Sequence, residues 1–96
     1  MALSGDHVRE RLLDIEGWAY DGKQISRLFA LPSFMDAIRF VNRVAELAER
    51  ANHHPDMDVR YDTVRVAVST HSARGITEKD FALAGQINAL ETAPEK

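Results

Sequence analysis

The sequence predicts an α+β domain in which three helices pack on a four-stranded antiparallel sheet, in the order α-β-β-α-β-β-α. Two pairs of short apolar segments are each joined by a tight-turn signal, which is typical of antiparallel hairpins. Three further segments carry apolar residues at helical spacing. No segment is long enough to act as a linker, so we expect residues 1–96 to form one domain, with a polar tail over 91–96.

Composition and charge narrow the class of protein. Hydrophobic residues make up 45% of the chain and charged residues 28%, a balance typical of an ordinary soluble globule. The formal net charge of −3 argues against a protein that binds nucleic acid by neutralising phosphates. The chain has no cysteine, which excludes disulfides, thiolate metal ligands and a thiol nucleophile. Because no apolar run has the length of a signal or a membrane span, we expect a cytoplasmic protein without a membrane partner.

The first helix and the first hairpin are predicted from caps and turn residues. Ser4 is a favourable N-cap, and the helix is expected to end near Gly17. Its apolar face consists of Val8, Leu12 and Ile15. Residues 18–20 and 24–31 are predicted to be strands around the turn signal Asp21-Gly22.

The longest helix is predicted to begin after Ser33 and to end at His53, before Pro55. Ser33 and Asp36 approximate a capping box, and no glycine or proline interrupts the segment. Its apolar residues form two adjacent stripes: Phe34, Ala37, Ile38, Val41, Ala45 and Ala48 in one, and Phe40, Val44, Leu47 and Ala51 in the other. One stripe is enough to attach a helix to its own sheet, so the second is either part of a wide core or a surface for another subunit.

The second hairpin and the last helix complete the domain. Residues 57–61 and 64–70 are predicted to be strands joined at Asp62-Thr63. Thr77 and Asp80 are placed to cap a final helix with an apolar face of Phe81, Ala84, Ile87 and Leu90.

The predicted register of this hairpin brings histidines together. With Asp62-Thr63 as a two-residue loop, the apolar cross-strand pairs are Tyr61–Val64, Val59–Val66 and Met57–Val68. Continued along the strands, the same register places His54 opposite His71, at a Cβ separation of about 5 Å. It also pairs Arg60 with Arg65, a like-charge contact with no explanation inside one subunit.

Histidine clusters of this kind are candidates for acid–base catalysis, because imidazole exchanges its proton near neutral pH. His53 is expected at the end of the long helix, with Glu49 four residues earlier to accept a hydrogen bond from it. A zinc site formed by these groups is the alternative, although adjacent histidines seldom converge on one ion. Trp18 is expected in the core, and His7 on the surface away from the site.

At these residues the sequence resembles the pterin-4a-carbinolamine dehydratase family. The resemblance runs from about Gly17 to Leu90 and is most specific over residues 49–56, where the chain has Glu-Arg-Ala-Asn-His-His-Pro-Asp. It continues through 61–64 and 69–71, and through Gly-Ile-Thr-Glu-Lys-Asp at 75–80. It implies the same α+β fold, a homodimer or homotetramer, and dehydration of 4a-hydroxytetrahydropterin to quinonoid dihydropterin. That step recycles the cofactor of aromatic amino acid hydroxylases.

The resemblance also assigns roles to residues, and it needs no metal or cofactor. It makes His53, His54 and His71 the catalytic set. The substrate-contacting positions that match are Glu49, Asn52, Ser69, Thr70, Ser72 and Asp80. Many animal members have aspartate at the position of Asn52 and an aromatic residue at that of Met57, so these two differences bear on pterin affinity. A non-catalytic binding or scaffolding protein on the same fold is the alternative.

Overall fold

The computed structural model describes residues 2–92, with side chains to residue 90. The predicted polar tail of residues 91–96 therefore lies largely outside the described residues. The elements are α1 (Gly5–Leu12), β1 (Ala19–Tyr20), β2 (Ile25–Ala30), α2 (Phe34–Ala51), β3 (Asp56–Arg60), β4 (Thr63–Val68), a short 3₁₀ helix η1 (His71–Ala73) and α3 (Glu78–Thr92). The predicted order of three α-helices and four strands is confirmed.

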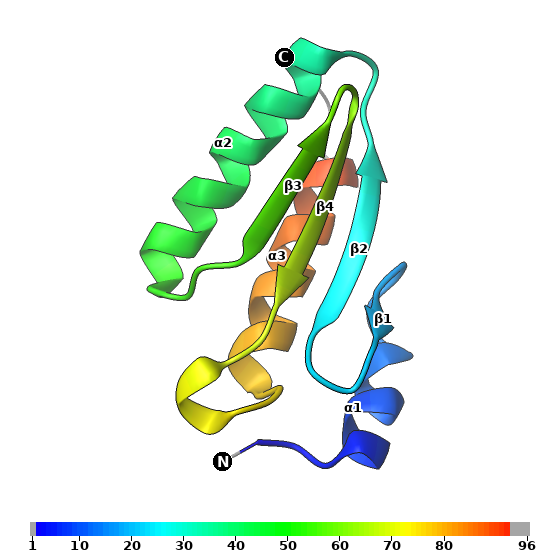
Figure 1. Ribbon diagram of the computed structural model, residues 1–96, viewed down its shortest axis with the longest axis vertical. Coiled ribbons are helices and arrows are strands. Elements are labelled where there is room, and N and C mark those ends of the chain that lie inside the picture. The colour runs from blue at the N-terminus through cyan, green and yellow to red at the C-terminus, as the bar shows by residue number, and fades with distance from the viewer. Residues whose placement is uncertain (1, 93–96) are drawn as a thin grey trace.

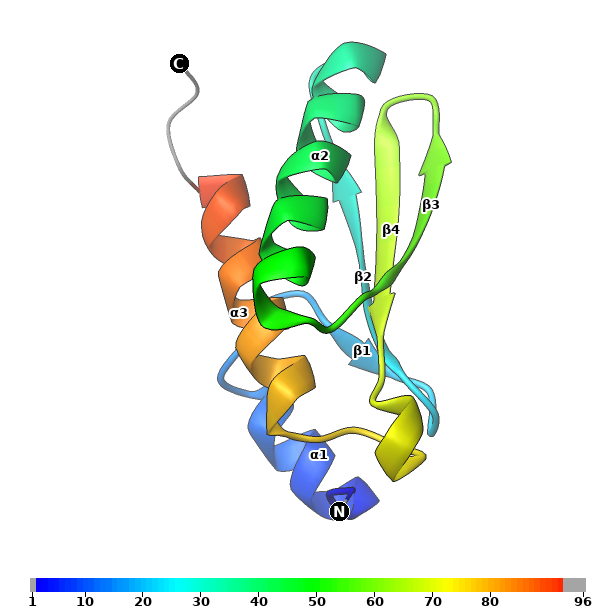
Figure 2. The ribbon, with the colours of Figure 1, turned by 90° about the vertical axis from the view of Figure 1, so that its left-hand side faces the viewer.

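The strands form one antiparallel sheet in the order β1-β2-β4-β3 (Figure 1). The two hairpins are thus joined through β2 and β4, and α2 crosses between β2 and the edge strand β3. Helices α2 and α3 lie side by side on one face of the sheet, with α1 beyond the start of α3 (Figure 2). The opposite face carries exposed side chains such as Leu28 and Arg65.

The core lies between the sheet and the two long helices. Sheet residues that point toward the helices are fully buried, namely Ile25, Phe29, Val64 and Val66. Trp18 is also buried and meets Phe29 edge-to-face, which confirms its predicted place in the core. The buried stripe of α2 consists of Ala37, Phe40, Val44 and Ala48 and so draws on both predicted stripes. Phe34 and Ala45 of the first stripe and Ala51 of the second are exposed.

The predicted helix caps are confirmed. The Ser4 hydroxyl accepts a hydrogen bond from the His7 amide, and the Ser33 hydroxyl accepts one from Asp36. α1 is shorter than predicted, because i to i−3 hydrogen bonds from Leu13 to Ile15 replace the α-helical pattern. Gly17, at φ +88°, then turns the chain into β1.

The predicted register of the β3–β4 hairpin is wrong by two residues. Val59 faces Val64 and Met57 faces Val66, and the two-residue loop is Tyr61-Asp62. A shift by two residues leaves every side chain on the same face of the sheet, so the apolar pattern could not distinguish the two registers. The predicted Arg60–Arg65 pair does not exist, since Arg65 faces Asp58.

Candidate active site

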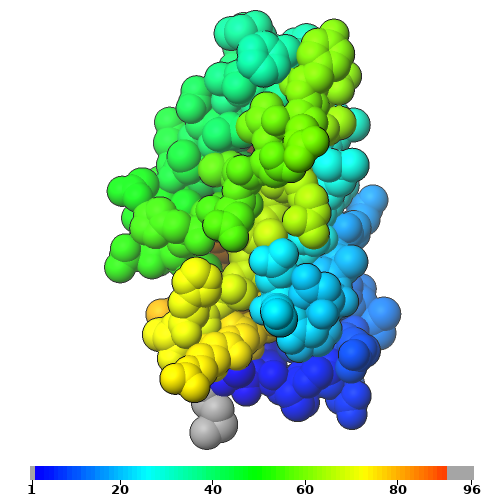
Figure 3. All heavy atoms as spheres, in the orientation of Figure 1, coloured from blue at the N-terminus to red at the C-terminus, as the bar shows by residue number. Residues whose placement is uncertain are grey.

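A cleft lies where α2 ends, β3 begins and the segment after β4 turns toward α3. In the space-filling view this last segment, in yellow, lies next to the green end of α2 (Figure 3). The cleft has a volume of about 440 Å³. It is lined by Asn52, His53, His54, Pro55, Asp56, Ser69, Thr70, His71, Ser72 and Lys79. The structure therefore places all three predicted catalytic histidines around one opening.

His53 is held by Asp80, which the sequence had suggested only as a helix cap and a family match. Its Nε2 lies 2.6 Å from Oδ1 of Asp80. The His53 side chain is 11% exposed and the Asp80 carboxylate is fully buried. A buried carboxylate that accepts a hydrogen bond from Nε2–H fixes both the tautomer and the ring orientation of the imidazole. In this tautomer Nδ1 is the nitrogen that can exchange a proton with a ligand.

The second oxygen of Asp80 is fixed by donors from two other segments. Oδ2 accepts hydrogen bonds from the Thr77 amide at 2.9 Å and from the Thr70 hydroxyl at 2.8 Å. The Lys79 amide in turn donates to the Thr77 hydroxyl, which completes the capping box predicted for the last helix. Asp80 lies in the first turn of α3, where unpaired N–H groups stabilise a negative charge. One carboxylate thus caps a helix and holds a site histidine.

His54 has a different partner from the one predicted. Its Nε2 lies 2.6 Å from Oε2 of Glu49, the carboxylate expected to orient His53. The predicted partner was wrong because α2 ends before His53. Asn52 adopts a left-handed conformation, φ 50° and ψ 44°, and turns the chain out of the helix. Helical spacing therefore no longer applies beyond it. Both members of the pair are exposed, His54 by 56% and Glu49 by 76% of their side chains.

His71 reaches the cleft from η1 and not through cross-strand pairing with His54. The β3–β4 register, continued by two residues, would bring His54 opposite Ser69. His71 follows Thr70, whose backbone pairs with Gly75 to close a short loop. Within this loop His71 and Ser72 are exposed, and Arg74 takes the left-handed conformation that turns the chain back.

The predicted substrate-contacting residues divide into two groups. Asn52, Ser69, Thr70 and Ser72 line the cleft directly. Glu49 and Asp80 do not line it and instead contact His54 and His53. Lys79 and Asp56 also line the cleft, and the sequence did not predict them as site residues. The signal for Lys79 was its place beside Asp80, which the family resemblance already assigned to the site.

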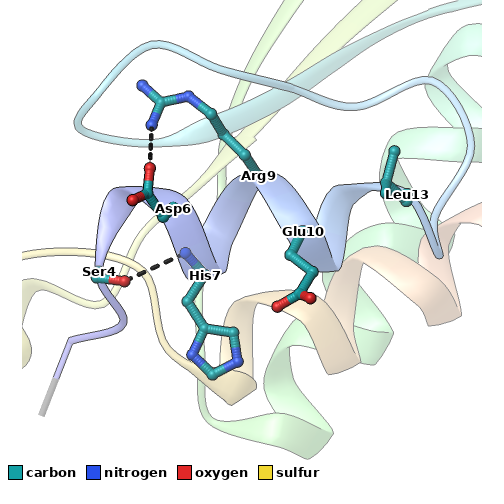
Figure 4. A pocket seen from close by; sticks show the side chains of 6 residues that line it. All are labelled: Ser4, Asp6, His7, Arg9, Glu10 and Leu13. Atoms are coloured by element: carbon teal, nitrogen blue, oxygen red, sulfur yellow. Dashed lines mark hydrogen bonds and ion pairs between the residues drawn. The ribbon is translucent and has the colours of Figure 1, made fainter.

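A second hollow follows the surface of α1 and contains the fourth histidine. It is lined by Ser4, Asp6, His7, Arg9, Glu10 and Leu13. Figure 4 shows that all of these side chains come from one helix and its cap, and that Ser4 and Asp6 are engaged by His7 and Arg9 of the same helix. Arg9 also lies over the Tyr20 ring of β1, with its guanidinium carbon 5.6 Å from the ring centroid.

Two further properties concern the described residues as a whole. Within residues 2–92, no three His, Cys, Asp or Glu side chains are grouped so that they could hold a metal ion. In the same part of the chain, no helix is long and apolar enough to cross a membrane.

Comparison with known proteins assigns the chain to a family. A family model described as "Pterin 4 alpha carbinolamine dehydratase" matches residues 1–90. The chain belongs to the pterin-4a-carbinolamine dehydratase family. A Roseiflexus sp. protein provisionally named as such a dehydratase is 50% identical over 88 residues, which cover 92% of this chain and 95% of the relative. A Sulfolobus acidocaldarius protein with the same provisional name is 38% identical over 91 residues, which cover 95% of this chain and 100% of that protein.

Two solved structures agree with the fold. The crystal structure of a transcriptional coactivator/pterin dehydratase from Brucella melitensis superposes with a TM-score of 0.88 at 35% identity, over 94% of this chain and 98% of that one. A pterin dehydratase-like protein described as a RuBisCO assembly factor in the alpha-carboxysome gives a TM-score of 0.69 at 22% identity, over 82% of this chain and 94% of that one. The second likeness concerns the fold alone.

Proposed function

We propose that this member of the family dehydrates 4a-hydroxytetrahydropterin to quinonoid dihydropterin. One observation carries the proposal: three histidines from the α2–β3 junction and η1 line a single cleft, and two of them are paired with carboxylates. The family resemblance predicts the catalytic residues at these same positions. The substrate class comes from the family, and the arrangement of the cleft supplies groups suited to the reaction.

The reaction requires two proton transfers and no change of oxidation state. The C4a–O bond breaks as a proton reaches the departing oxygen, which leaves as water. The proton on N5 is lost as the C4a–N5 double bond forms. Imidazoles can do both, and a positioned general acid or base contributes about 10² to 10⁴-fold in rate.

The environments of the histidines suggest how this work is divided. Because Asp80 holds His53 through Nε2, we assign proton exchange at His53 to Nδ1. His54 and Glu49 are exposed enough to exchange protons with solvent between turnovers. His71 completes the set from the other wall of the cleft. Asn52, Ser69, Ser72 and Lys79 are the cleft residues that we assign to holding the pterin ring.

A stopped-flow absorbance assay of 4a-hydroxytetrahydropterin breakdown tests the proposal. The wild type should accelerate breakdown over buffer, and His54→Ala or His71→Ala should each lower kcat by about 100-fold. His7→Ala is the matched control, since His7 is an exposed histidine outside the cleft, and it should keep full activity. A folded wild type without activity would refute the dehydratase function. Equal activity in all the variants would refute the assigned site.

A non-catalytic binding role is the alternative, because the Brucella melitensis relative is described as both a transcriptional coactivator and a pterin dehydratase. Of the two functions, only catalysis requires the histidines of the cleft. A purely scaffolding protein would bind its partner equally well after His54→Ala and His71→Ala, and would show no dehydration.

Assembly and cellular context belong to the same proposal. We assign a homodimer or homotetramer, supported by the edge position of β3 and by Phe34 and Met35, which are 46% and 54% exposed on α2. Sedimentation equilibrium should give a mass of two or four chains. A cytoplasmic location and a link to an aromatic amino acid hydroxylase follow from the reaction, which would return the pterin that such an enzyme consumes.

A further inference from the structure

We propose that Thr70 is a positioning residue of this site, acting on His53 through Asp80 and on His71 through its own backbone. The proposal deepens the function above by assigning Thr70 a role different from substrate contact. Thr70 is 6% exposed, although it borders the cleft. A threonine that is almost fully buried is poorly placed to select a ligand and well placed to order its neighbours.

The Thr70 hydroxyl has a single proton, and its position defines a chain of hydrogen bonds. That proton goes to Oδ2 of Asp80, at 2.8 Å. The contact between the Thr70 and Thr77 hydroxyls, also 2.8 Å, must then be donated by Thr77. The donors thus point in one direction from the Lys79 amide through both hydroxyls to Oδ2 of Asp80, and His53 donates from the other side to Oδ1.

This arrangement leaves Asp80 little freedom to rotate. Thr70 is the side-chain donor on Oδ2 that comes from outside the capping segment of α3, so it ties the carboxylate to the end of the sheet. Without it, the carboxylate would be fixed only by the Thr77 amide and by His53 itself. A catalytic group misplaced by a fraction of an ångström loses much of its effect, because proton transfer requires aligned donors and acceptors.

The Thr70 backbone acts on the opposite wall of the cleft. Its N–H donates to the Gly75 carbonyl at 2.8 Å, and its own carbonyl accepts from Ala73 at 3.1 Å. These bonds close the turn that carries His71 and Ser72. One residue therefore connects the support of His53 with the loop of His71.

Proton NMR of His53 tests the side-chain role without reference to activity. In the wild type the Nε2–H proton, buried against Asp80, should give a resolved signal far downfield. In Thr70→Val, which keeps the shape and loses the hydroxyl, its exchange with water should be about tenfold faster. Thr70→Ala should behave in the same way and serves as the second variant if valine perturbs folding. Thr70→Ser should restore the wild-type signal.

Thr63→Val is the matched control, since Thr63 also donates its hydroxyl, to the Arg60 carbonyl at 2.9 Å, but far from Asp80. It should leave the His53 signal unchanged. An unchanged signal in both Thr70→Val and Thr70→Ala would overturn the proposal. So would a signal that Thr70→Ser fails to restore.

The dehydratase assay distinguishes positioning from substrate contact. Thr70→Val should lower kcat about tenfold and change KM by less than about twofold, with rescue by Thr70→Ser. A raised KM at unchanged kcat would show that Thr70 binds substrate and would overturn its positioning role. If the wild type lacked dehydratase activity, the function above would fail while the NMR result would still decide the role of Thr70.

Discussion

At the scale of single residues, the two histidine–carboxylate pairs have equal contact distances but differ in what they contribute to stability. Both contacts measure 2.6 Å, but His53–Asp80 is buried whereas His54–Glu49 is largely exposed. An exposed ion pair contributes at most about 1 kcal/mol and is screened by salt. Removing one partner of a buried hydrogen bond costs about 1–3 kcal/mol, because the other partner is left unsatisfied in the interior. His53 is therefore the histidine whose position depends on the fold.

Asp80→Asn separates the charge of this carboxylate from its shape. The amide can still accept from Thr70 and Thr77 but then presents its NH₂ group to His53, which must switch to the Nδ1–H tautomer. We expect a loss of about 1–3 kcal/mol in unfolding free energy and at least about 100-fold in kcat. Nitrogen-15 chemical shifts of His53 report the tautomer directly, and urea denaturation reports the stability.

Asp36→Asn is the control for this substitution, because Asp36 is the capping carboxylate of α2 and lies outside the cleft. Asp36→Asn should lower the unfolding free energy by at most about 1 kcal/mol and leave kcat unchanged. An Asp80→Asn protein that keeps the Nε2–H tautomer of His53 would contradict the proposed hydrogen-bond direction.

The sequence was sufficient to find the three histidines but not their partners. Adjacent His53 and His54, followed by Pro55, and the Thr70-His71 dipeptide are visible without coordinates. Glu49 was assigned to His53 by helical spacing, which fails once Asn52 turns left-handed. Asp80 was visible as a cap, yet its contact with His53 spans 27 residues of sequence and depends on how α3 docks.

At the scale of elements, sequence periodicity determined which face of each strand is buried and left the alignment of neighbouring strands open. The apolar face of β3 was predicted correctly while its pairing with β4 was two residues out. The loop between β3 and β4 fixes how the two strands align, and within this loop Tyr61 has φ +53°. A large aromatic residue is an unusual choice for that conformation, so nothing in the sequence favoured it there.

Tyr61→Gly should stabilise the protein, because glycine adopts a positive φ without steric cost and the Tyr61 side chain is 75% exposed. The expected gain in unfolding free energy is about 1 kcal/mol, measured by urea denaturation. Asp62, at the other loop position, does not have a positive φ. Asp62→Gly should therefore lower the unfolding free energy by about 0.5–1 kcal/mol, because glycine increases the conformational entropy of the unfolded chain. The reverse order of stabilities would show that the hairpin has a different loop.

The β1–β2 turn predicts a dependence on pH. The Asp21 carboxylate accepts hydrogen bonds from the amides of Gln24 and Lys23, which hold the pKa of Asp21 below its ordinary value of 3.8. A lowered pKa stabilises the folded state above that value, and the contribution is lost as the pH falls below it. The unfolding free energy should therefore fall more steeply from about pH 4 to pH 2 in wild type than in Asp21→Asn. Parallel pH profiles would contradict this.

At the scale of the whole molecule, α3 connects segments that are far apart in the chain. The Asn88 amide oxygen accepts from Trp18 Nε1–H and from Arg27, each at 2.8 Å, and its NH₂ group donates to the Glu16 carbonyl at 3.0 Å. Leu3 donates to the Ile76 carbonyl at 2.8 Å near the other end of the same helix. One half-buried asparagine thus joins the segment between α1 and β1, and also β2, to α3.

Asn88→Ala should lower the unfolding free energy by about 2–3 kcal/mol, since three hydrogen bonds are lost and a largely buried indole N–H loses its acceptor. Fluorescence of Trp18, the one tryptophan in the chain, follows the transition in urea. Asn42→Ala, at an exposed position of α2, should change the stability by less than about 0.5 kcal/mol. An equal loss of unfolding free energy in both variants would show that the hydrogen bonds of Asn88 contribute no more to stability than an exposed asparagine does.

The two-residue ambiguity of the β3–β4 register has a consequence for the cleft. A hairpin that slides by two residues keeps its buried and exposed faces, so the core alone would tolerate the change. The same slide, to the register predicted from the sequence, would move the start of β3 by about 7 Å along β4 and place His54 opposite His71 instead of Ser69. The two-residue loop Tyr61-Asp62 therefore sets where His54 lies along the cleft, although the burial pattern of the core does not depend on it.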